Sequence, residues 1–211
     1  MGSSVTYVAR HAASRARRVF QSRYGLFKRV IDILGAGAAL IVLSPVLLVV
    51  AVLVWLSSPG PVLYWSERMG RFGQSFRMPK FRTMTTCSRV VTREAARDGD
   101  VSITPVGAFL RRTSLDELPQ LLSVLRGDMS LVGPRPLLLC DTTNTLRQSY
   151  PEVRDVRPGI TGLAQISGRN MVSPRNKVRY DAFYAQRLCL FLDMRIAART
   201  VGAVVGGRDI L

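Results

Sequence analysis

Histidine is almost absent from this chain. His11 is the only one among 211 residues, and it lies in a basic stretch near the N-terminus. This scarcity argues against a Ser-His-Asp triad, a Cys-His pair and a histidine-ligated zinc site. Acid–base or nucleophilic chemistry would have to use carboxylates, serine, tyrosine, lysine or a metal-bound water.

Cysteine is scarce too. Cys87, Cys140 and Cys189 are widely spaced and form no CxxC or other metal-ligand pattern. An odd, scattered set is typical of a reducing compartment. We interpret the three cysteines as ordinary core or surface residues.

Negative charge and lysine are also in short supply. Fourteen Asp and Glu residues face 30 Lys and Arg residues, which gives a formal charge of +16. Only Lys28, Lys80 and Lys177 are lysines, so arginine carries nearly all the positive charge. This balance indicates an anionic partner, which is nucleic acid, acidic lipid headgroups or a phosphorylated substrate. Arginine grips phosphate through a bidentate fork, although a genome that favours Arg codons explains the same bias.

One long apolar segment stands out. No charged residue occurs from Ile33 to Ser66, and the dense part, 33–55, is long enough for a membrane helix. Ser44–Pro45 interrupts it near the middle, where proline kinks or breaks a helix and a serine hydroxyl can satisfy the freed carbonyl. Both flanks are basic, which favours a dip with both ends on one side over a crossing. A kinked spanning helix stays open, whereas the basic stretch before the segment is too long for a signal peptide.

The rest of the chain predicts an α+β fold, mostly helical and irregular, in a single domain. Short extended runs are expected on both sides of a turn at Met69–Gly73. The other predicted parts are a loop or short helix at Thr85–Thr104, helices at Val106–Arg112, Ser114–Arg126 and Tyr180–Val205, and irregular chain at Leu131–Leu138 and Leu146–Gly168. The last helix has apolar residues at helical spacing, and either the membrane surface or the core accounts for them.

Asp116–Glu117 is the acidic pair that bears most on function. Its simplest interpretation is a capping box, S-x-x-E, that begins at Ser114. The alternative is a functional site, because the pair is bracketed by Arg111, Arg112, Arg126 and Arg135. Carboxylates at a helix start among arginines should have a pKa that is held down. Such a pair offers a nucleophile toward phosphorus and a magnesium ligand without histidine.

Several motifs together resemble the monotopic phosphoglycosyl transferases of the bacterial sugar transferase family. They are KRVID (Lys28–Asp32), Ser44–Pro45, PKFRTM (Pro79–Met84), TPVGAFLRRTSLDELPQL (Thr104–Leu121), GDMSLVGPRP (Gly127–Pro136), RPGITGLAQISGR (Arg157–Arg169) and YDAFYAQ (Tyr180–Gln186). The resemblance implies Mg²⁺-dependent transfer of a sugar-1-phosphate from a nucleotide diphosphate sugar, with uridine expected, to polyprenyl phosphate, which initiates a bacterial surface glycan. It also implies a covalent phosphosugar on Asp116, with Glu117 beside it at the metal. Leu122–Ser123 departs from the family, where WN is common.

The resemblance also implies an organisation: a basic leader at 1–27, a re-entrant membrane helix at 28–56 broken at Ser44–Pro45, and a catalytic domain at 57–211 that faces the cytoplasm from the bacterial inner membrane. With about 27 residues before Lys28, the chain is expected to be the minimal catalytic form. Membrane lipids are expected partners, nucleic acid is not, and a homodimer stays open.

We expect basic side chains to bind the diphosphate and the polyprenyl phosphate. The candidates are Lys80, Arg82, Arg111, Arg112, Arg135 and Arg169. Structural ion pairs or anionic lipid headgroups are alternatives for each. The rival function is a membrane-tethered basic binding or scaffold protein for anionic lipid or nucleic acid, but there is no extended basic–aromatic stripe.

Overall fold

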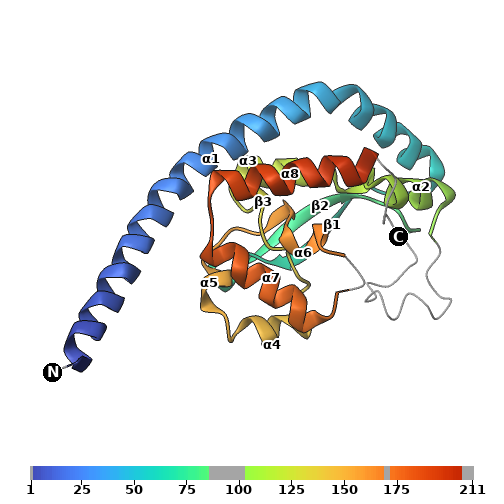
Figure 1. The fold of residues 1–211 in the computed structure, drawn as a ribbon. Coiled ribbons are helices and arrows are strands. Elements are labelled where there is room, and N and C mark those ends of the chain that lie inside the picture. The colour runs from blue at the N-terminus through green and yellow to red at the C-terminus, as the bar shows by residue number, and fades with distance from the viewer. Residues whose placement is uncertain (1, 86–102, 169–171, 206–211) are drawn as a thin grey trace.

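The computed structural model describes residues 2–85, 103–168 and 172–205. The helices are α1 (Gly2–Ser57), α2 (Pro105–Thr113), α3 (Gln120–Arg126), α4 (Thr143–Arg147), α5 (Pro151–Arg154), α6 (Leu163–Ile166), α7 (Pro174–Gln186) and α8 (Leu190–Val205). The strands are β1 (Leu63–Met69), β2 (Ser75–Phe81), β3 (Ser130–Val132) and β4 (Gly159–Thr161). Figure 1 shows α1 as an arm that arches over the other elements. The mixed, mainly helical class predicted from the sequence is confirmed.

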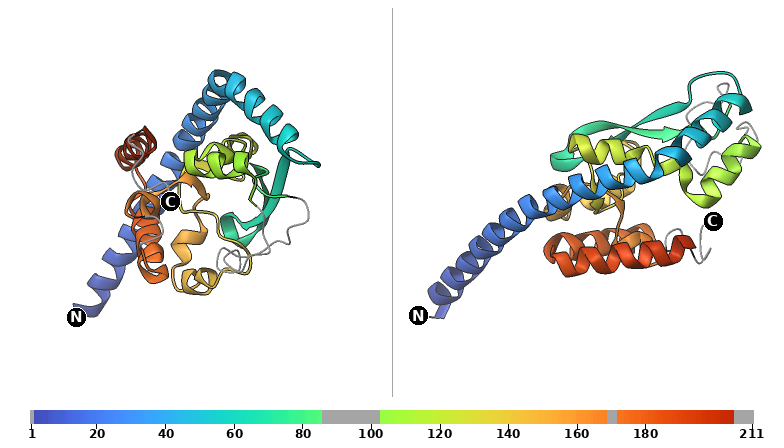
Figure 2. Two further views of the ribbon diagram at one scale, coloured as in Figure 1. Left: turned by 90° about the vertical axis from the view of Figure 1, so that its right-hand side faces the viewer. Right: turned by 90° about the horizontal axis from the view of Figure 1, so that it is seen from above.

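Helix α1 is continuous through the predicted interruption, with Pro45 inside it. It bends at the top of its arch, which Figure 1 and the left view of Figure 2 both show. Proline cannot donate to the carbonyl four residues earlier, which belongs to Ile41. The Ser44 hydroxyl donates to that oxygen instead, at 2.8 Å. The Ser-Pro pair therefore produces a bend within one helix, not two separate helices.

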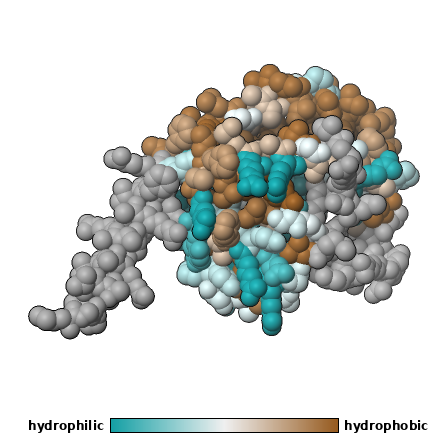
Figure 3. All heavy atoms as spheres, viewed as in Figure 1, coloured by the Kyte–Doolittle hydropathy of each residue, from teal (hydrophilic) through white to brown (hydrophobic). Residues whose placement is uncertain are grey.

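The arch of α1 carries many exposed apolar side chains. Residues Tyr24–Ser57 are long and apolar enough to cross a membrane by length and composition. The exposed large apolar residues near and beyond the bend include Ile41, Val42, Leu48, Val49, Trp55 and Leu56. In Figure 3 brown, hydrophobic residues gather along the upper edge where the helix arches, and teal residues gather lower down. Such a patch on a folded chain marks a membrane or protein contact.

The inner face of α1 packs on three small hydrophobic clusters in succession. Tyr24 joins one cluster, Ala36 a second, and Val50 and Val54 a third. Their partners come from β1–β2, from α2 and α3, and from α7 and α8: Met78, Phe81, Leu110, Leu121, Val124, Tyr184 and Ile196. Seen from above, in the right view of Figure 2, α1 passes between the β1–β2 hairpin and the α7–α8 pair. The membrane-type helix is therefore part of the domain core.

A buried polar network holds the middle of this helix, at residues 24–32, against the domain. Lys28 forms an ion pair with Asp193 at 2.6 Å, and the hydroxyls of Tyr24 and Tyr184 bond the same carboxylate at 2.6 and 2.7 Å. One turn further along, Asp32 accepts hydrogen bonds from the Ser130 hydroxyl and the Leu131 backbone N–H, both at 3.0 Å. These contacts give the KRVID motif a structural role, because they join α1 to β3 and α8.

The two sheets are small. Strands β1 and β2 form an antiparallel hairpin from Leu63↔Phe81 to Met69↔Ser75, which confirms the predicted extended runs and the turn between them. Strands β3 and β4 pair in parallel, although the sequence suggested irregular chain there. Glycine allows this approach: a Cβ on Gly159 would lie 2.1 Å from the Gly133 backbone nitrogen. Glycine and proline are frequent in these motifs and are typical of turns, so the sequence did not predict the short strands.

Two predicted helices are divided in the structure. The Ser114–Arg126 segment consists of a 3₁₀ turn at Leu115–Glu117 followed by α3. The Tyr180–Val205 segment belongs to α7, which begins earlier at Pro174, and to α8. Helix α8 buries Ile196 and exposes Phe191 and Met194, so it has both a core face and an exposed apolar face. Most of the predicted loop at 85–104 lies outside the described residues.

Candidate active site

The Asp116–Glu117 pair lies in the 3₁₀ turn between α2 and α3. Ser114 adopts the left-handed conformation, with φ 59°, and its backbone N–H bonds the Arg111 carbonyl to end α2. The Ser114 side chain makes no cap hydrogen bond, so the capping-box interpretation is wrong. Because α2 stops abruptly and Pro119 precedes α3, the two carboxylates are presented on a short, separate turn.

Glu117 is held by two cations. Its Oε1 accepts from Lys80 Nζ at 2.7 Å and from an Arg135 guanidinium nitrogen at 3.1 Å. Burial alone would raise the pKa of Glu117, but the charges and hydrogen bonds of Arg135 and Lys80 outweigh it and hold that pKa at about 2. Glu117 is therefore an ionised group whose position is fixed from both sides.

Asp116 differs from its neighbour. It is 9 % exposed, and the structure gives its carboxylate no hydrogen bond from the described part of the chain. Burial raises the pKa of Asp116, helped by the charge of Glu117 and opposed by Lys80, Arg111 and Arg135. The expectation of a depressed pKa thus holds for Glu117 and is wrong for Asp116. A poorly solvated carboxylate with no bound donor is a stronger nucleophile than one in water.

The other predicted phosphate-binding residues lie in different places. Arg111 is exposed, donates to the Thr83 hydroxyl at 2.9 Å and is close enough to influence Asp116. Arg112 is exposed, and its guanidinium carbon lies 6.0 Å from the centre of the Phe109 ring. The structure therefore brings Lys80, Arg111 and Arg135 to the pair but gives Arg112 no contact with it. Arg169 lies outside the described residues.

Arg82 serves the end of α1. It is buried and donates to the carbonyls of Pro59, at 2.9 Å, and Ser58. These two residues follow α1 directly, and Arg82 also approaches the Val54 carbonyl, one of the last four of α1, at 3.5 Å, where a cation is favoured. This geometry matches the structural alternative for Arg82, not a role in phosphate binding.

Arg68 is a neighbour of the site that sequence reasoning missed. Its half-buried guanidinium lies where the charges of Arg135, Tyr64 and Glu117 affect it, and its Nε donates to the Ser66 hydroxyl at 3.0 Å. The signal was present in the strand pattern, because Arg68 lies four residues after Tyr64, the partner of Lys80. An even spacing along β1 puts both on the face that carries Lys80.

The donor set of the pair fits magnesium. No cluster of three His, Cys, Asp or Glu residues occurs in the described ranges, so an all-protein metal cage is not seen there. Magnesium is usually held by one or two carboxylates together with substrate phosphate oxygens. Asp116 leaves its carboxylate oxygens available to such an ion within the described residues, and Glu117 lies beside it.

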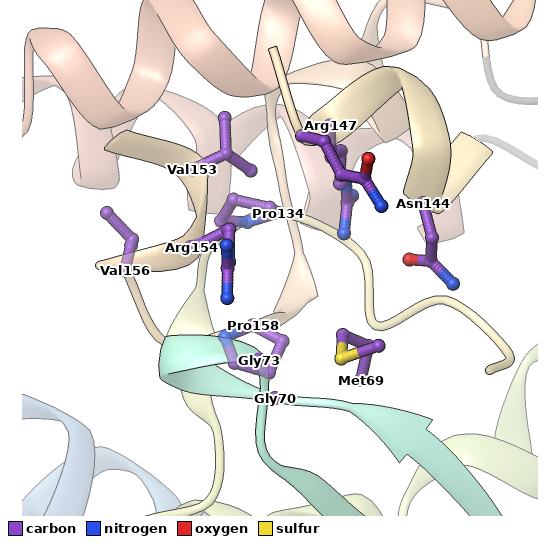
Figure 4. A pocket seen from close by; sticks show the side chains of 11 residues that line it. Met69, Gly70, Gly73, Pro134, Asn144, Arg147, Val153, Arg154, Val156 and Pro158 are labelled. Carbon is purple, nitrogen blue, oxygen red and sulfur yellow. The ribbon is translucent and has the colours of Figure 1, made fainter. Parts of the chain in front are cut away.

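A cavity of about 230 Å³ lies elsewhere, between the β1–β2 turn and helices α4 and α5. Figure 4 shows Arg147, Asn144 and Arg154 around it, with Pro134 on one wall. Neither Asp116 nor Glu117 lines this cavity. Arg147 connects it to the site, because Arg147 donates to the Arg135 carbonyl at 3.0 Å and pairs with Asp181 at 2.6 Å.

Comparison with known proteins agrees with this geometry. Residues 23–207 match the family described as bacterial sugar transferase. The exopolysaccharide production protein ExoY of Rhizobium meliloti is 42 % identical over 195 residues, which cover 85 % of this chain and 86 % of that protein. The UDP-N-acetylgalactosamine-undecaprenyl-phosphate N-acetylgalactosaminephosphotransferase of Aeromonas hydrophila is 39 % identical over 87 % of this chain and 45 % of its own length.

A third relative is the UDP-glucose:undecaprenyl-phosphate glucose-1-phosphate transferase of Klebsiella pneumoniae, 40 % identical over 83 % of this chain. The chain spans 39 % of the length of that protein, so it matches nearly all of the shorter relative and less than half of the longer two. Since the family match covers most of the chain and includes the Asp116–Glu117 turn, the chain belongs to the bacterial sugar transferase family.

Proposed function

We propose that this protein transfers a sugar-1-phosphate from a UDP-sugar to undecaprenyl or a similar polyprenyl phosphate, as the first membrane step of an exopolysaccharide. The substrates are those in the names of the Aeromonas and Klebsiella transferases, and the pathway is that in the name of the exopolysaccharide production protein ExoY. The observation that carries the proposal is the buried Asp116 carboxylate beside a Glu117 that Lys80 and Arg135 hold in place.

The transfer proceeds in two steps. Asp116 attacks the phosphorus that bears the sugar, and the bond to the bridging oxygen breaks, so that nucleoside monophosphate leaves with the electron pair. A phosphate oxygen of the polyprenyl phosphate then attacks the same phosphorus, and the bond to Asp116 breaks. Lys80, Arg111 and Arg135 stabilise the charge on the phosphates throughout. Bound Mg²⁺, held by Asp116 and Glu117, would neutralise the diphosphate.

We propose further that α1 is re-entrant and that the domain faces the cytoplasm. Three features support an arrangement in which both ends of the apolar segment lie on the same side of the membrane. They are the bend at Pro45, the exposed apolar arch and the basic residues on both flanks. The exposed Phe191 and Met194 on α8 suit the same membrane surface.

Topology gives one prediction. In a cysteine-free background that expresses in the inner membrane, Gln21→Cys and Gln74→Cys should both react with an impermeant maleimide only from the cytoplasmic side. Replacing Ser44 and Pro45 with Ala and Leu should straighten α1 and carry position 21 to the other side. Labelling of the two positions from opposite sides in the parent that keeps Ser44 and Pro45 would contradict the re-entrant arrangement.

Turnover tests the function itself. Radiolabelled UDP-sugars should give a lipid-linked product with undecaprenyl phosphate and Mg²⁺, and release of UMP should identify the preferred donor in a screen. Chelation of the metal should stop the reaction. If none of the UDP-sugars gives product while the protein is folded, the proposal fails.

The proposed binding of phosphate by Lys80, Arg111 and Arg135 gives a second prediction. Arg135→Ala should lower turnover about 10²-fold, the usual scale for losing a preorganised charge-stabilising donor. Glu117 would also lose one of its two cations. Arg77→Ala on the opposite face of the hairpin, where its strand partner is Glu67, is the matched control and should retain activity. Near-normal turnover in Arg135→Ala would show that this arginine is structural.

The rival function is a basic binding or scaffold protein on the membrane. It explains the net charge, but not a carboxylate pair whose pKa values are shifted in opposite directions. Membership of a transferase family also speaks against it.

A further inference from the structure

We propose that Arg68 and Arg135 form one subsite for a phosphate monoester, which is used twice in each turnover. The nucleoside monophosphate that leaves would occupy it first, and the phosphate of the polyprenyl acceptor would occupy it second. This inference rests on the two-step transfer proposed above and assigns Arg68 a direct contact with both substrates.

The register of the hairpin places Arg68 on the same face as the site. Tyr64 pairs with Lys80, and directly opposite residues of an antiparallel pair lie on the same face. Arg68 lies four residues after Tyr64 in β1, so it is on the same face. Lys80, also on this face, contacts Glu117. The backbone of Arg68 also bridges to Leu138, three residues after Arg135. The hairpin and the loop that carries Arg135 are therefore joined at Arg68.

The guanidinium of Arg68 has little to neutralise it. Its described hydrogen bond goes to the neutral Ser66 hydroxyl. The four ion pairs among the described residues use Lys28, Lys80, Arg135 and Arg147, and none includes Arg68. Burial lowers the pKa of Arg68 and so does Arg135, while Tyr64, Glu117 and Asp141 act in the opposite direction. Arg68 is half-buried and Arg135 is exposed, and the repulsion between their two guanidinium groups falls when an anion lies between them.

Basic side chains outnumber acids around the pair, which favours a bound anion. Four cations act here, which are Lys80, Arg68, Arg111 and Arg135. The described acids that act on the same groups are Asp116, Glu117 and Asp141, one fewer than the cations. A phosphate monoester carries about −1.5 to −2 at neutral pH. Arginine binds such a group through its planar fork.

The chemistry explains why one subsite suffices. In phosphoryl transfer the attacking and leaving oxygens lie roughly in line across the phosphorus. Asp116 attacks from one side in the first step and leaves toward that side in the second. The nucleoside monophosphate and the polyprenyl phosphate must therefore occupy, one after the other, the side of the phosphorus opposite Asp116. Both present the same chemical group, a phosphate monoester, to the arginines.

The experiment compares Arg68→Gln, Arg68→Lys and the control Arg77→Gln in the full-length protein in nanodiscs. Three quantities are measured: the Kd for UMP by calorimetry, the rapid-quench rate of UMP release from UDP-sugar alone, and the rate at which polyprenyl phosphate discharges the isolated phosphosugar enzyme. Arg68→Gln should weaken UMP binding about 10-fold or more and slow both half-reactions about 10²-fold. Arg68→Lys should fall between, because it keeps the charge and loses the fork.

The control and the melting temperatures should stay at wild-type values. Unchanged UMP binding in Arg68→Gln, or slowing of only one half-reaction, would overturn the shared subsite. If the wild-type protein releases no UMP from any UDP-sugar, the proposed function fails, and UMP affinity in Arg68→Gln still decides whether Arg68 binds phosphate.

Discussion

Asp116→Asn should abolish transfer, with a loss of about 10⁴-fold or more, the scale for removing a catalytic nucleophile. An amide cannot form the acyl-phosphate, and the substitution changes little in volume. Glu117→Gln should also impair turnover severely, because a neutral amide cannot pair with Lys80 and Arg135. Initial rates of UMP release and of lipid-linked product measure both effects.

The wild-type enzyme gives the complementary result. With UDP-sugar and Mg²⁺ but no acceptor, it should release close to one UMP per protein and retain the phosphosugar covalently. Peptide mass mapping should place the adduct on Asp116. Asp155→Asn, an exposed acid, is the matched control. An active Asp116→Asn variant, together with no adduct on rapid quench, would falsify the covalent route and leave direct attack by the polyprenyl phosphate.

Asp193→Ala should produce the largest loss of stability. It leaves the Lys28 ammonium buried without its partner, and it removes the acceptor of the Tyr24 and Tyr184 hydroxyls. Breaking a buried ion pair from one side costs about 3–5 kcal/mol. Denaturant unfolding in detergent measures the free energy of unfolding.

A double variant separates the pair from the surrounding packing. Lys28→Met combined with Asp193→Leu should recover much of the stability, because replacing both charges with apolar groups leaves no buried unpaired charge. Glu152→Gln, which alters an exposed hydrogen bond to Gln186, should change the free energy of unfolding by about 0.5 kcal/mol or less. Equal losses in the Asp193 variant and this control would show that the network does not anchor α1.

Local signals in the sequence predicted the hairpin and the bend well. Alternating extended residues around the Gly70–Gly73 turn mark β1 and β2. The Ser44–Pro45 pair marks the bend, because one residue removes a donor and the other supplies one. Both depend on neighbours in the chain, which a sequence displays directly.

Contacts between distant segments were not predictable in the same way. The left-handed Ser114 that ends α2 and the parallel pairing of β3 with β4 depend on tertiary packing. The opposite pKa shifts of Asp116 and Glu117 arise because one side chain is buried without donors and the other meets Lys80. The sequence showed that both acids have arginines nearby, but it did not show that the two carboxylates lie at different distances from the basic groups. The contacts of Arg82 with the carbonyls of Ser58 and Pro59, at the end of α1, likewise depend on tertiary packing and could not be predicted from the sequence.

Arg29 links the membrane helix to the turn that holds Asp116. Its guanidinium donates to the carbonyls of Val124 and Leu125 at the end of α3, a helix that begins three residues after Glu117. In the proposed re-entrant arrangement, the height of the carboxylates above the lipid is thus set by how deeply α1 inserts. Hydrocarbon thickness becomes a determinant of the rate, because a thicker or thinner leaflet displaces α1 and the turn together while the acceptor phosphate stays at the headgroup level. The protein should accordingly work best in membranes of one acyl-chain length.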